Sequence, residues 1–578
     1  MTTNPFSRRE FLKTGSNGFG YLAFAALAQQ QALRANPPTA TGPLAPKAPH
    51  FAARAKHVIF LCMQGAPSHV DTFDYKPKLI ADSGKGAPSA AGRYGTAKLM
   101  ASPWKFNRQG KSGLWISELF PNVGKHADEM CILNSMATDL PAHPQAFSQL
   151  HTGTTQFVRP SLGSWALYGL GTLNENLPGF ITVNPPGNAT RTYGSAFLPA
   201  IYQGTKIGGN GFPGGGAAGR RFGGSEQATV ANIKNSRYST DEQRTQLDLV
   251  QALNKARMQQ DGGVSAEVEG VIESYELAFR MQAEVPKVMD LSKETAATKA
   301  LYGIDEQETD TFGKQCLMAR KFIEAGVRFI ELTNGNWDQH FNLKASLERN
   351  TAAIDKPIAG LLTDLKQRGL LKDTLIIWGG EFGRTPHSQG EDGRDHNNKG
   401  FSMWMAGGGV KGGMNYGMTD DYGYEAVQNK MHIHDWHATV LALLGLDHER
   451  LTFRYAGRDF RLTDVYGTVA KETEQHLLGG YNTWAARSAG LEVTAEPRIV
   501  AADLQLLEQV FSKPRRKFEQ TLGPVATANA KRAVAYYRLH EFSPPIAHDE
   551  TGHADAAFEP GVLFYLEGDD LLPGLFKT

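Results

Sequence analysis

Short apolar runs that alternate with long amphipathic segments are the feature that most constrains the fold of this chain. Five runs have the continuous apolar character of strands buried on both faces of a sheet: residues 57–63, 130–133, 179–183, 328–332 and 374–378. In other segments apolar residues return at three- and four-residue steps, as in helices: residues 240–258, 265–283 and 345–368. This alternation predicts an α/β fold with a doubly wound, mostly parallel sheet and helices on both faces.

The composition is that of a globular protein and excludes one class of partner. Of the 578 residues 41% are hydrophobic and 21% are charged, which is enough to bury a large core. With 60 basic and 59 acidic residues the net charge is only +1, too small to attract nucleic acid, so no such partner is expected. Cys62, Cys131 and Cys316 are too widely spaced for a disulfide framework or a zinc–thiolate motif. We expect each to be a buried apolar residue.

The N-terminus has the features of an export signal. Arg8 and Arg9 precede an apolar run at residues 19–27 that ends in small residues. The pattern predicts a twin-arginine signal peptide at residues 1–35, and therefore a periplasmic or extracellular protein. Because the run is too short to span a bilayer, we expect no transmembrane segment in the mature chain. Export in the folded state suits a protein that acquires its metal in the cytoplasm.

Changes in composition divide the rest of the chain. Residues 36–56 are rich in proline and alanine and predict a linker. Residues 57–478 hold the strand and helix patterns and predict one large domain, and residues 479–578 predict a C-terminal extension. The glycine-rich residues 208–224 lack the Lys-Ser/Thr ending of a phosphate-binding loop, so a surface loop is expected there.

Polar residues that directly follow buried strands are candidates for a site, because ligands bind beyond the carboxyl ends of parallel strands. Ser68, His69 and Asp71 follow the first strand and could bind a metal or a substrate anion, although Ser68 could equally cap a helix. Asp338 and His340 follow the fourth strand. In extended chain their side chains point the same way and could share a cation, although such a pair is more often a solvated loop.

The fifth strand leads into a segment with both ligands and arginines. Glu381, Asp395 and His396 offer carboxylate and imidazole groups. Arg384 and Arg394 could clamp an anionic oxygen, although surface ion pairs are the usual fate of arginines.

Three histidines lie within six residues at the start of a predicted helix: His432, His434 and His437. Capping of the helix N-terminus explains the neighbouring Asp435, but it does not explain the histidines. Mixed Asp, Glu and His ligands suit zinc or another divalent transition ion better than calcium. The residues therefore predict one or two divalent ions, with zinc favoured.

Several segments resemble sulfatases in the same order along the chain. Residues 361–383 are similar to the sulfatase helix and strand that end at a metal-binding Asp-His, and residues 434–446 to the late His-x-Asp and its helix. A more specific resemblance is to a large family of exported, sulfatase-like bacterial proteins of unknown function, the domain-of-unknown-function 1501 type, in the alkaline phosphatase superfamily. Its marks are residues 65–74, 159–165, 381–386 and 455–460.

This resemblance implies an alkaline phosphatase-like fold and a metal-dependent hydrolase of phosphate or sulfate esters, acting on a small-molecule or polysaccharide ester. Counting back from Thr152-Gly153 places His143 where the family's nucleophile stands, so His143 could accept a phosphoryl group, act as a general acid or bind substrate. We expect catalytic roles for His143, Arg159 and Arg384 and substrate contacts from Ser68, His69 and Arg394. The expected metal ligands are Asp338, His340, Glu381, Asp395, His396, His434 and His437.

Departures from the sulfatase pattern support a second hypothesis. Gln64 stands where a metal-binding aspartate is expected, and Glu381-Phe382 takes the place of the metal-binding Asp-His. His143 in the nucleophile position makes the modified-cysteine chemistry of sulfatases unexpected. The alternative is therefore an exported binding or assembly protein that keeps the fold without catalysis.

Overall fold

The computed structural model describes residues 42–87, 97–185, 191–208, 233, 237–260, 266–473, 546–547 and 556–557. The chain divides into two compact units, Met1–Gln475 and His476–Thr578. The predicted signal peptide at 1–35, nearly all of the glycine-rich loop at 208–224 and nearly all of the extension at 479–578 lie outside the described residues. Within the described residues, no helix has both the length and the apolar character needed to cross a membrane.

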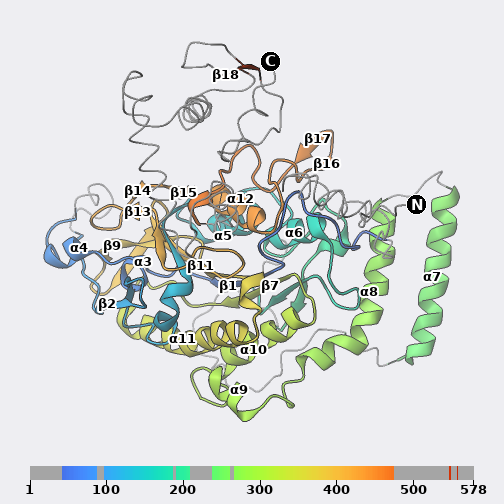
Figure 1. Ribbon diagram of the computed structural model, residues 1–578, viewed down its shortest axis with the longest axis horizontal. Helices are drawn as coiled ribbons and strands as arrows, with labels where there is room; N and C mark the ends of the chain where they lie inside the picture. Colours follow the sequence, from blue (N-terminus) through green and yellow to red (C-terminus); the bar gives the residue numbers. More distant parts are fainter. Residues whose placement is uncertain are drawn as a thin grey trace, which may run out of the picture. The chain divides into compact units, whose positions relative to one another are not determined.

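A sheet of nine strands forms the centre of the first unit (Figure 1). Its strands are β1 His57–Met63, β4 Met130–Ala137, β5 Phe180–Val183, β6 Thr205–Ile207, β7 Phe329–Asn334, β8 Thr374–Gly379, β11 Phe401–Ala406, β12 Met414–Tyr416 and β15 Met431–His432. The strand order is β12-β4-β11-β8-β1-β7-β5-β6, with β15 also paired to β4. Every pair is parallel except those of β11, which is antiparallel to β4 and β8. The predicted mostly parallel sheet is confirmed, and the five apolar runs are β1, β4, β5, β7 and β8.

Helices cover both faces of this sheet (Figure 1). On one face lie α10 Asp310–Glu324 and α11 Leu343–Gln367, and on the other lie α5 His143–Thr152, α6 Leu162–Leu170 and α12 Ile433–Leu443. Two further long helices, α7 Thr240–Gln260 and α8 Ala266–Met289, pack against each other. The three helices predicted from periodicity are α7, α8 and α11, so the predicted α/β architecture is confirmed.

Smaller elements complete the described structure. Five two-stranded hairpins or ribbons are β2 Phe106–Gln109 with β3 Leu114–Ser117, β9 Gly383–Gln389 with β10 Gly393–Asn397, β13 Met418–Thr419 with β14 Ala426–Gln428, β16 Phe453–Tyr455 with β17 Arg458–Phe460, and β18 Ile546–Ala547 with β19 Ala556–Ala557. The short helices are α3 His69–Thr72, α4 Pro77–Ala81, α9 Ala296–Leu301, η1 Val123–Glu129, η3 Ala200–Tyr202, η4 Leu371–Asp373 and η5 Lys471–Thr473.

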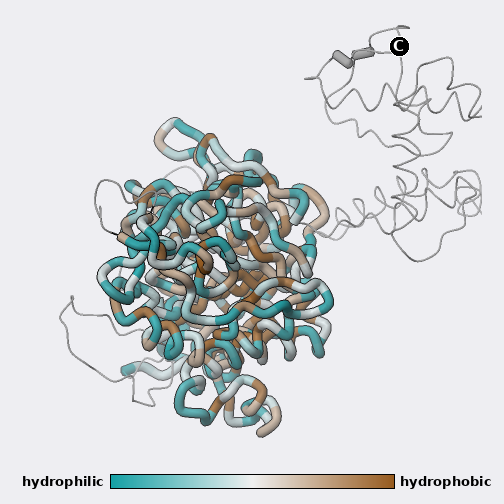
Figure 2. Tube along the Cα trace, turned by 90° about the vertical axis from the view of Figure 1, so that its left-hand side faces the viewer, coloured by the Kyte–Doolittle hydropathy of each residue, from teal (hydrophilic) through white to brown (hydrophobic). Residues whose placement is uncertain are grey.

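The core lies between the sheet and its helices, where the trace of Figure 2 is most apolar. Every residue of β1, β4 and β8 is buried. A strand that is covered on both faces has no face toward solvent, so neither face favours polar residues. These segments are therefore continuous apolar runs in the sequence. Cys62, Cys131 and Cys316 are all buried and unpaired, so their predicted burial is confirmed.

The three central strands end together and place the loops that form the site. In the register of the sheet Met63 pairs with Asn334, and Cys62 pairs with Gly379. The loop after β1 turns at Gly65, which has a φ of +110° and where an added Cβ would lie 2.7 Å from the backbone nitrogen of Asp338. Only glycine allows this close approach of two loops.

Candidate metal centre

Four side chains from three separate segments converge beyond the carboxyl ends of β7 and β8. His143 is the first residue of α5, Asp338 and His340 lie in the loop after β7, and His396 lies on β10. One ligand atom from each of the four lies within 4.8 Å of all the others. We call these four residues the open group, because the Asp338 side chain is 43% exposed.

The distances within the open group match the edges of a coordination tetrahedron. Oδ1 of Asp338 lies 3.2 Å from Nε2 of His143, 3.0 Å from Nε2 of His340 and 3.4 Å from Nε2 of His396. The Nε2 atoms of His340 and His396 are 2.9 Å apart. With metal–ligand bonds of about 2.0–2.1 Å, the ligand atoms of a tetrahedral zinc ion are about 3.3 Å from one another.

The other ring nitrogen of each histidine is held by an acceptor outside the open group. The contacts are His143 Nδ1 to Glu381 Oε1 at 2.7 Å, His340 Nδ1 to Gln389 Oε1 at 2.5 Å, and His396 Nδ1 to the Pro141 carbonyl oxygen at 2.8 Å. Because these oxygens accept hydrogen bonds, each Nδ1 carries the proton and donates it. In its neutral form each ring would present the lone pair of Nε2 to the group, as metal-binding histidines do.

One atom of the open group has no hydrogen-bond partner. Nε2 of His143 is buried and makes no hydrogen bond to any described residue, although it lies 3.2 Å from the Asp338 carboxylate. A buried polar atom without a partner is costly to the fold. A cation held by the three Nε2 atoms and Oδ1 would satisfy it, so the residues present fit a divalent metal.

The electrostatics of the open group agree with this fit. Burial lowers the pKa of His143, but the carboxylates of Asp338 and Glu381 outweigh burial and raise that pKa to about 9. Burial would raise the pKa of Asp338, but His143, His396 and Arg384 hold it well below its usual value. The group therefore combines a charged carboxylate with an imidazole that keeps a proton until a cation displaces it.

Glu381 and Arg384, expected as a ligand and a catalytic residue, lie behind the open group. Glu381 is fully buried and accepts hydrogen bonds from the Gly65 amide, at 3.0 and 3.3 Å, and from His143. Arg384 is also fully buried and donates to the carbonyls of Gly65 and Ala66 and, at 2.5 Å, to Asp338 Oδ1. Glu381 therefore orients His143, and Arg384 orients Asp338.

Replacing Glu381 with glutamine tests this orienting role. The variant removes the charge that holds the His143 imidazole, and partners of this kind contribute about 10–100-fold to metal affinity. We expect Glu381→Gln to bind zinc about 10–100-fold more weakly in competition with a chelator. Glu391→Gln, at an exposed carboxylate of the neighbouring hairpin, is the control and should keep the affinity of the unchanged protein. Equal affinities in the two variants would contradict the assignment.

The structure places the late histidines away from the open group. His434 donates through Nε2 to the Gly153 carbonyl and His437 to the Leu150 carbonyl, each at 2.8 Å. Leu150 is seven residues from His143 along α5, a rise of about 10 Å. Burial lowers the pKa of His437 to about 3, so it is neutral. His434 and His437, expected as ligands of the same ion, therefore pack against the far end of α5.

Three side chains that were expected to contact substrate bind other groups inside the protein instead. Arg394 forms a bidentate ion pair with Asp71, which also accepts from Ser68 at 2.5 Å, and all three side chains are fully buried. His69 donates to the Gly423 carbonyl at 2.8 Å and is buried as well. These residues fix α3 and β10 in place and do not face the open group.

Two other expected site residues lie at or beyond the edge of the group. Asp395 comes within 3.9 Å of His340 Nδ1 but faces the side of the ring opposite to Nε2. The guanidinium of Arg159 lies 4.1 Å above the ring of Phe460, on the hairpin of β16 and β17. The structure thus joins Asp338, His340 and His396 with His143, whereas Arg159 packs on the ring of Phe460.

Gln389 and Pro141 are the functional contacts that the sequence did not indicate. Each supplies a single oxygen to a histidine far away in the chain, 49 residues for Gln389 and 255 for Pro141. Neither residue type carries a ligand signal, so no local pattern could have identified them.

A family model described as "Protein of unknown function (DUF1501)" matches residues 55–473. No curated protein matches the chain. Similar solved structures include a sulfatase from Pseudoalteromonas sp., with 15% identity, coverage of 68% of this chain and 69% of that one, and a TM-score of 0.30. A phosphonate monoester hydrolase from Silicibacter pomeroyi has 10% identity, coverage of 68% of this chain and 73% of that one, and a TM-score of 0.28. A protein in the alkaline phosphatase superfamily from Vibrio parahaemolyticus has 10% identity, coverage of 76% of each chain, and a TM-score of 0.29.

Proposed function

We propose that this chain, which belongs to the family described as protein of unknown function DUF1501, is a metal-dependent hydrolase of phosphate or sulfate esters. The observation that carries the proposal is the convergence of three imidazole Nε2 atoms and one carboxylate oxygen, each within 4.8 Å of the others, at the carboxyl edge of the sheet. Zinc is the ion that best suits this set of donors. The sequence resemblance to sulfatases supports the choice of phosphate and sulfate esters.

The residues of the open group have distinct tasks in this proposal. His143, Asp338, His340 and His396 would hold the ion. A bound divalent ion supplies Lewis-acid activation of water and of ester oxygens. Arg384 keeps the Asp338 carboxylate in place through a hydrogen bond of 2.5 Å. The exposed side of Asp338 leaves a path along which an ester can approach.

His143 acts as a ligand in this proposal and not as the nucleophile. Nδ1 is engaged by Glu381 at 2.7 Å, and Nε2 faces Asp338 within the open group. Neither nitrogen is free to accept a phosphoryl group while an ion is held. Water is therefore the nucleophile that fits the site.

Export by the twin-arginine route is part of the same proposal. It is supported by Arg8, Arg9 and the short apolar run at residues 19–27. A metal enzyme that works outside the cytoplasm gains from export after folding, because its ion can be bound before the protein leaves the cytoplasm.

The experiment is metal analysis of the purified protein combined with turnover of aryl phosphate and aryl sulfate esters. We expect bound zinc, hydrolysis of at least one ester class, loss of turnover on treatment with a chelator, and recovery when zinc is returned. Absence of bound metal would contradict the proposal. Bound metal without turnover of either ester class would instead support the exported binding protein.

A further inference from the structure

A second charged group lies where a charge is least expected, in the centre of the sheet. Glu331 is in the middle of β7, between β1 and β5, and its side chain is only 2% exposed. Moving an ionised carboxylate into an apolar core is strongly unfavourable unless a counter-charge and hydrogen bonds accompany it. The carboxylate therefore requires a partner in the core.

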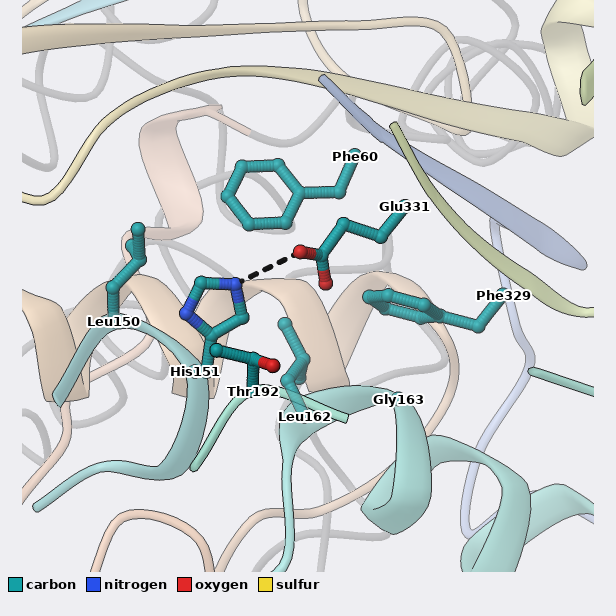
Figure 3. Close-up of a pocket in the computed structure, with 8 residues that line it drawn as sticks. All are labelled: Phe60, Leu150, His151, Leu162, Gly163, Thr192, Phe329 and Glu331. Atoms are coloured by element: carbon teal, nitrogen blue, oxygen red, sulfur yellow. Dashed lines mark hydrogen bonds and ion pairs between the residues drawn. The ribbon is translucent and has the colours of Figure 1, made fainter. Parts of the chain in front are cut away.

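The first partner is His151 from α5, which faces Glu331 beneath the ring of Phe60 (Figure 3). Nε2 of His151 lies 3.1 Å from Oε1 of Glu331, and Nδ1 lies 2.8 Å from the Phe147 carbonyl oxygen. Since a carbonyl only accepts, Nδ1 carries a proton. Nε2 of a neutral ring then presents its lone pair to the carboxylate, so either a second proton or a metal ion must lie between them.

The hydroxyl of Thr333 also donates to Oε1 of Glu331, at 3.4 Å, and the thiol of Cys62 lies nearby. Phe60 pairs with Glu331 and Cys62 pairs with Thr333 in the register of β1 and β7, so Cys62 and Glu331 project from the same face of the sheet. The sulfur of Cys62, a ring nitrogen of His151 and a carboxylate oxygen of Glu331 all lie within 4.8 Å of one another, and all three residues are buried. Cys131 and Cys316 belong to no comparable group among the described residues.

We propose that Cys62, His151 and Glu331 form a second metal site, closed to solvent, that binds zinc or a similar transition ion. Thiolate, imidazole and carboxylate are all common zinc ligands. A thiolate and a carboxylate together balance the two positive charges of the ion, so the filled site is neutral, as a buried site requires.

A small cavity lies beside two of the three proposed ligands. It has a volume of about 10 Å³ and is lined by His151, Glu331 and Thr192 together with apolar side chains. This is close to the smallest space that holds one water molecule. A water there would give zinc a fourth ligand beside the three from the protein.

Burial determines how this site is filled. Burial, with Glu331 and Glu381 nearby, raises the pKa of the Cys62 thiol well above its usual value, so binding of the ion releases the thiol proton. The closed site has no exposed ligand, whereas the open group has Asp338 at 43% exposure. We therefore expect the closed site to be loaded during folding and to exchange its ion much more slowly than the open group.

The experiment counts the ions and identifies a thiolate ligand. Protein produced in cobalt-supplemented medium should bind about two ions per chain and show a thiolate-to-cobalt charge-transfer band in the near ultraviolet. Cys62→Ser should lose one ion and the band, while Cys131→Ser and Cys316→Ser, at equally buried cysteines, should keep both. His396→Ala should lose the other ion and keep the band.

Two results would overturn the closed site, and neither depends on hydrolytic activity. The first is a cobalt-loaded wild-type protein without the thiolate band. The second is a metal content that is the same in Cys62→Ser and in the unchanged protein. Either result means that His151 and Glu331 share a proton instead. The open group contains no cysteine. If the open group fails to bind metal, the thiolate band of the closed site is therefore unaffected.

Discussion

Replacing Asp338 with alanine is expected to remove the ion from the open group and to lower ester hydrolysis strongly. Oδ1 of Asp338 lies within 3.4 Å of the Nε2 atoms of all three histidines. Without it only three imidazoles remain as ligands, and no carboxylate would bind the ion directly. Loss of Lewis-acid stabilisation worth about 4 kcal/mol lowers turnover by about 10³-fold. Metal content and kcat/KM on aryl esters measure the two effects.

A second variant separates loss of the metal from loss of stability. Asp338→Ala also leaves the fully buried Arg384 without its carboxylate, so part of its effect could come from the fold. His396→Ala removes a ligand and leaves no buried charge, and it should lose the same ion. His448→Ala, whose imidazole contacts Thr463 outside the open group, should keep both ion and turnover. Retention of metal in Asp338→Ala and His396→Ala would contradict the site.

Replacing Asp71 with alanine is expected to destabilise the protein by about 3–5 kcal/mol. The carboxylate accepts from Arg394 Nε at 2.7 Å and Nη2 at 3.0 Å, and both side chains are 0% exposed. Removing one partner leaves a guanidinium charge in the core without a counter-charge. The shift of the midpoint of urea-induced unfolding, followed by circular dichroism, measures the loss.

The control for this prediction is an ion pair on the surface. Arg454 and Asp459 are 3.2 Å apart, and their side chains are 67% and 54% exposed. Exposed pairs contribute about 0–1 kcal/mol, so Asp459→Ala should leave the midpoint nearly unchanged. Similar midpoints for Asp71→Ala and Asp459→Ala would show that the Asp71–Arg394 pair does not stabilise the core.

Part of the candidate site could be predicted because its signal is local. Asp338 and His340 are two residues apart in a loop that follows a recognisable buried strand, and the structure places both in the open group. Arg394 likewise follows a recognisable buried strand in the sequence, but the structure pairs it with Asp71, 323 residues away in the chain. A sequence shows which residues can bind an anion or a cation, but it does not show which of them the fold has already neutralised.

The sequence alone determined the layered α/β architecture, because strands covered on both faces and helices covered on one leave different periodicities within short windows. Only the tertiary structure decided how the polar residues are divided. The two ends of α5 place His143 in the open group and His151 against Glu331. The pairing of β1 with β7 puts Cys62 and Glu331 on one face of the sheet. Such groupings depend on the register and direction of elements far apart in the chain, which local patterns do not encode.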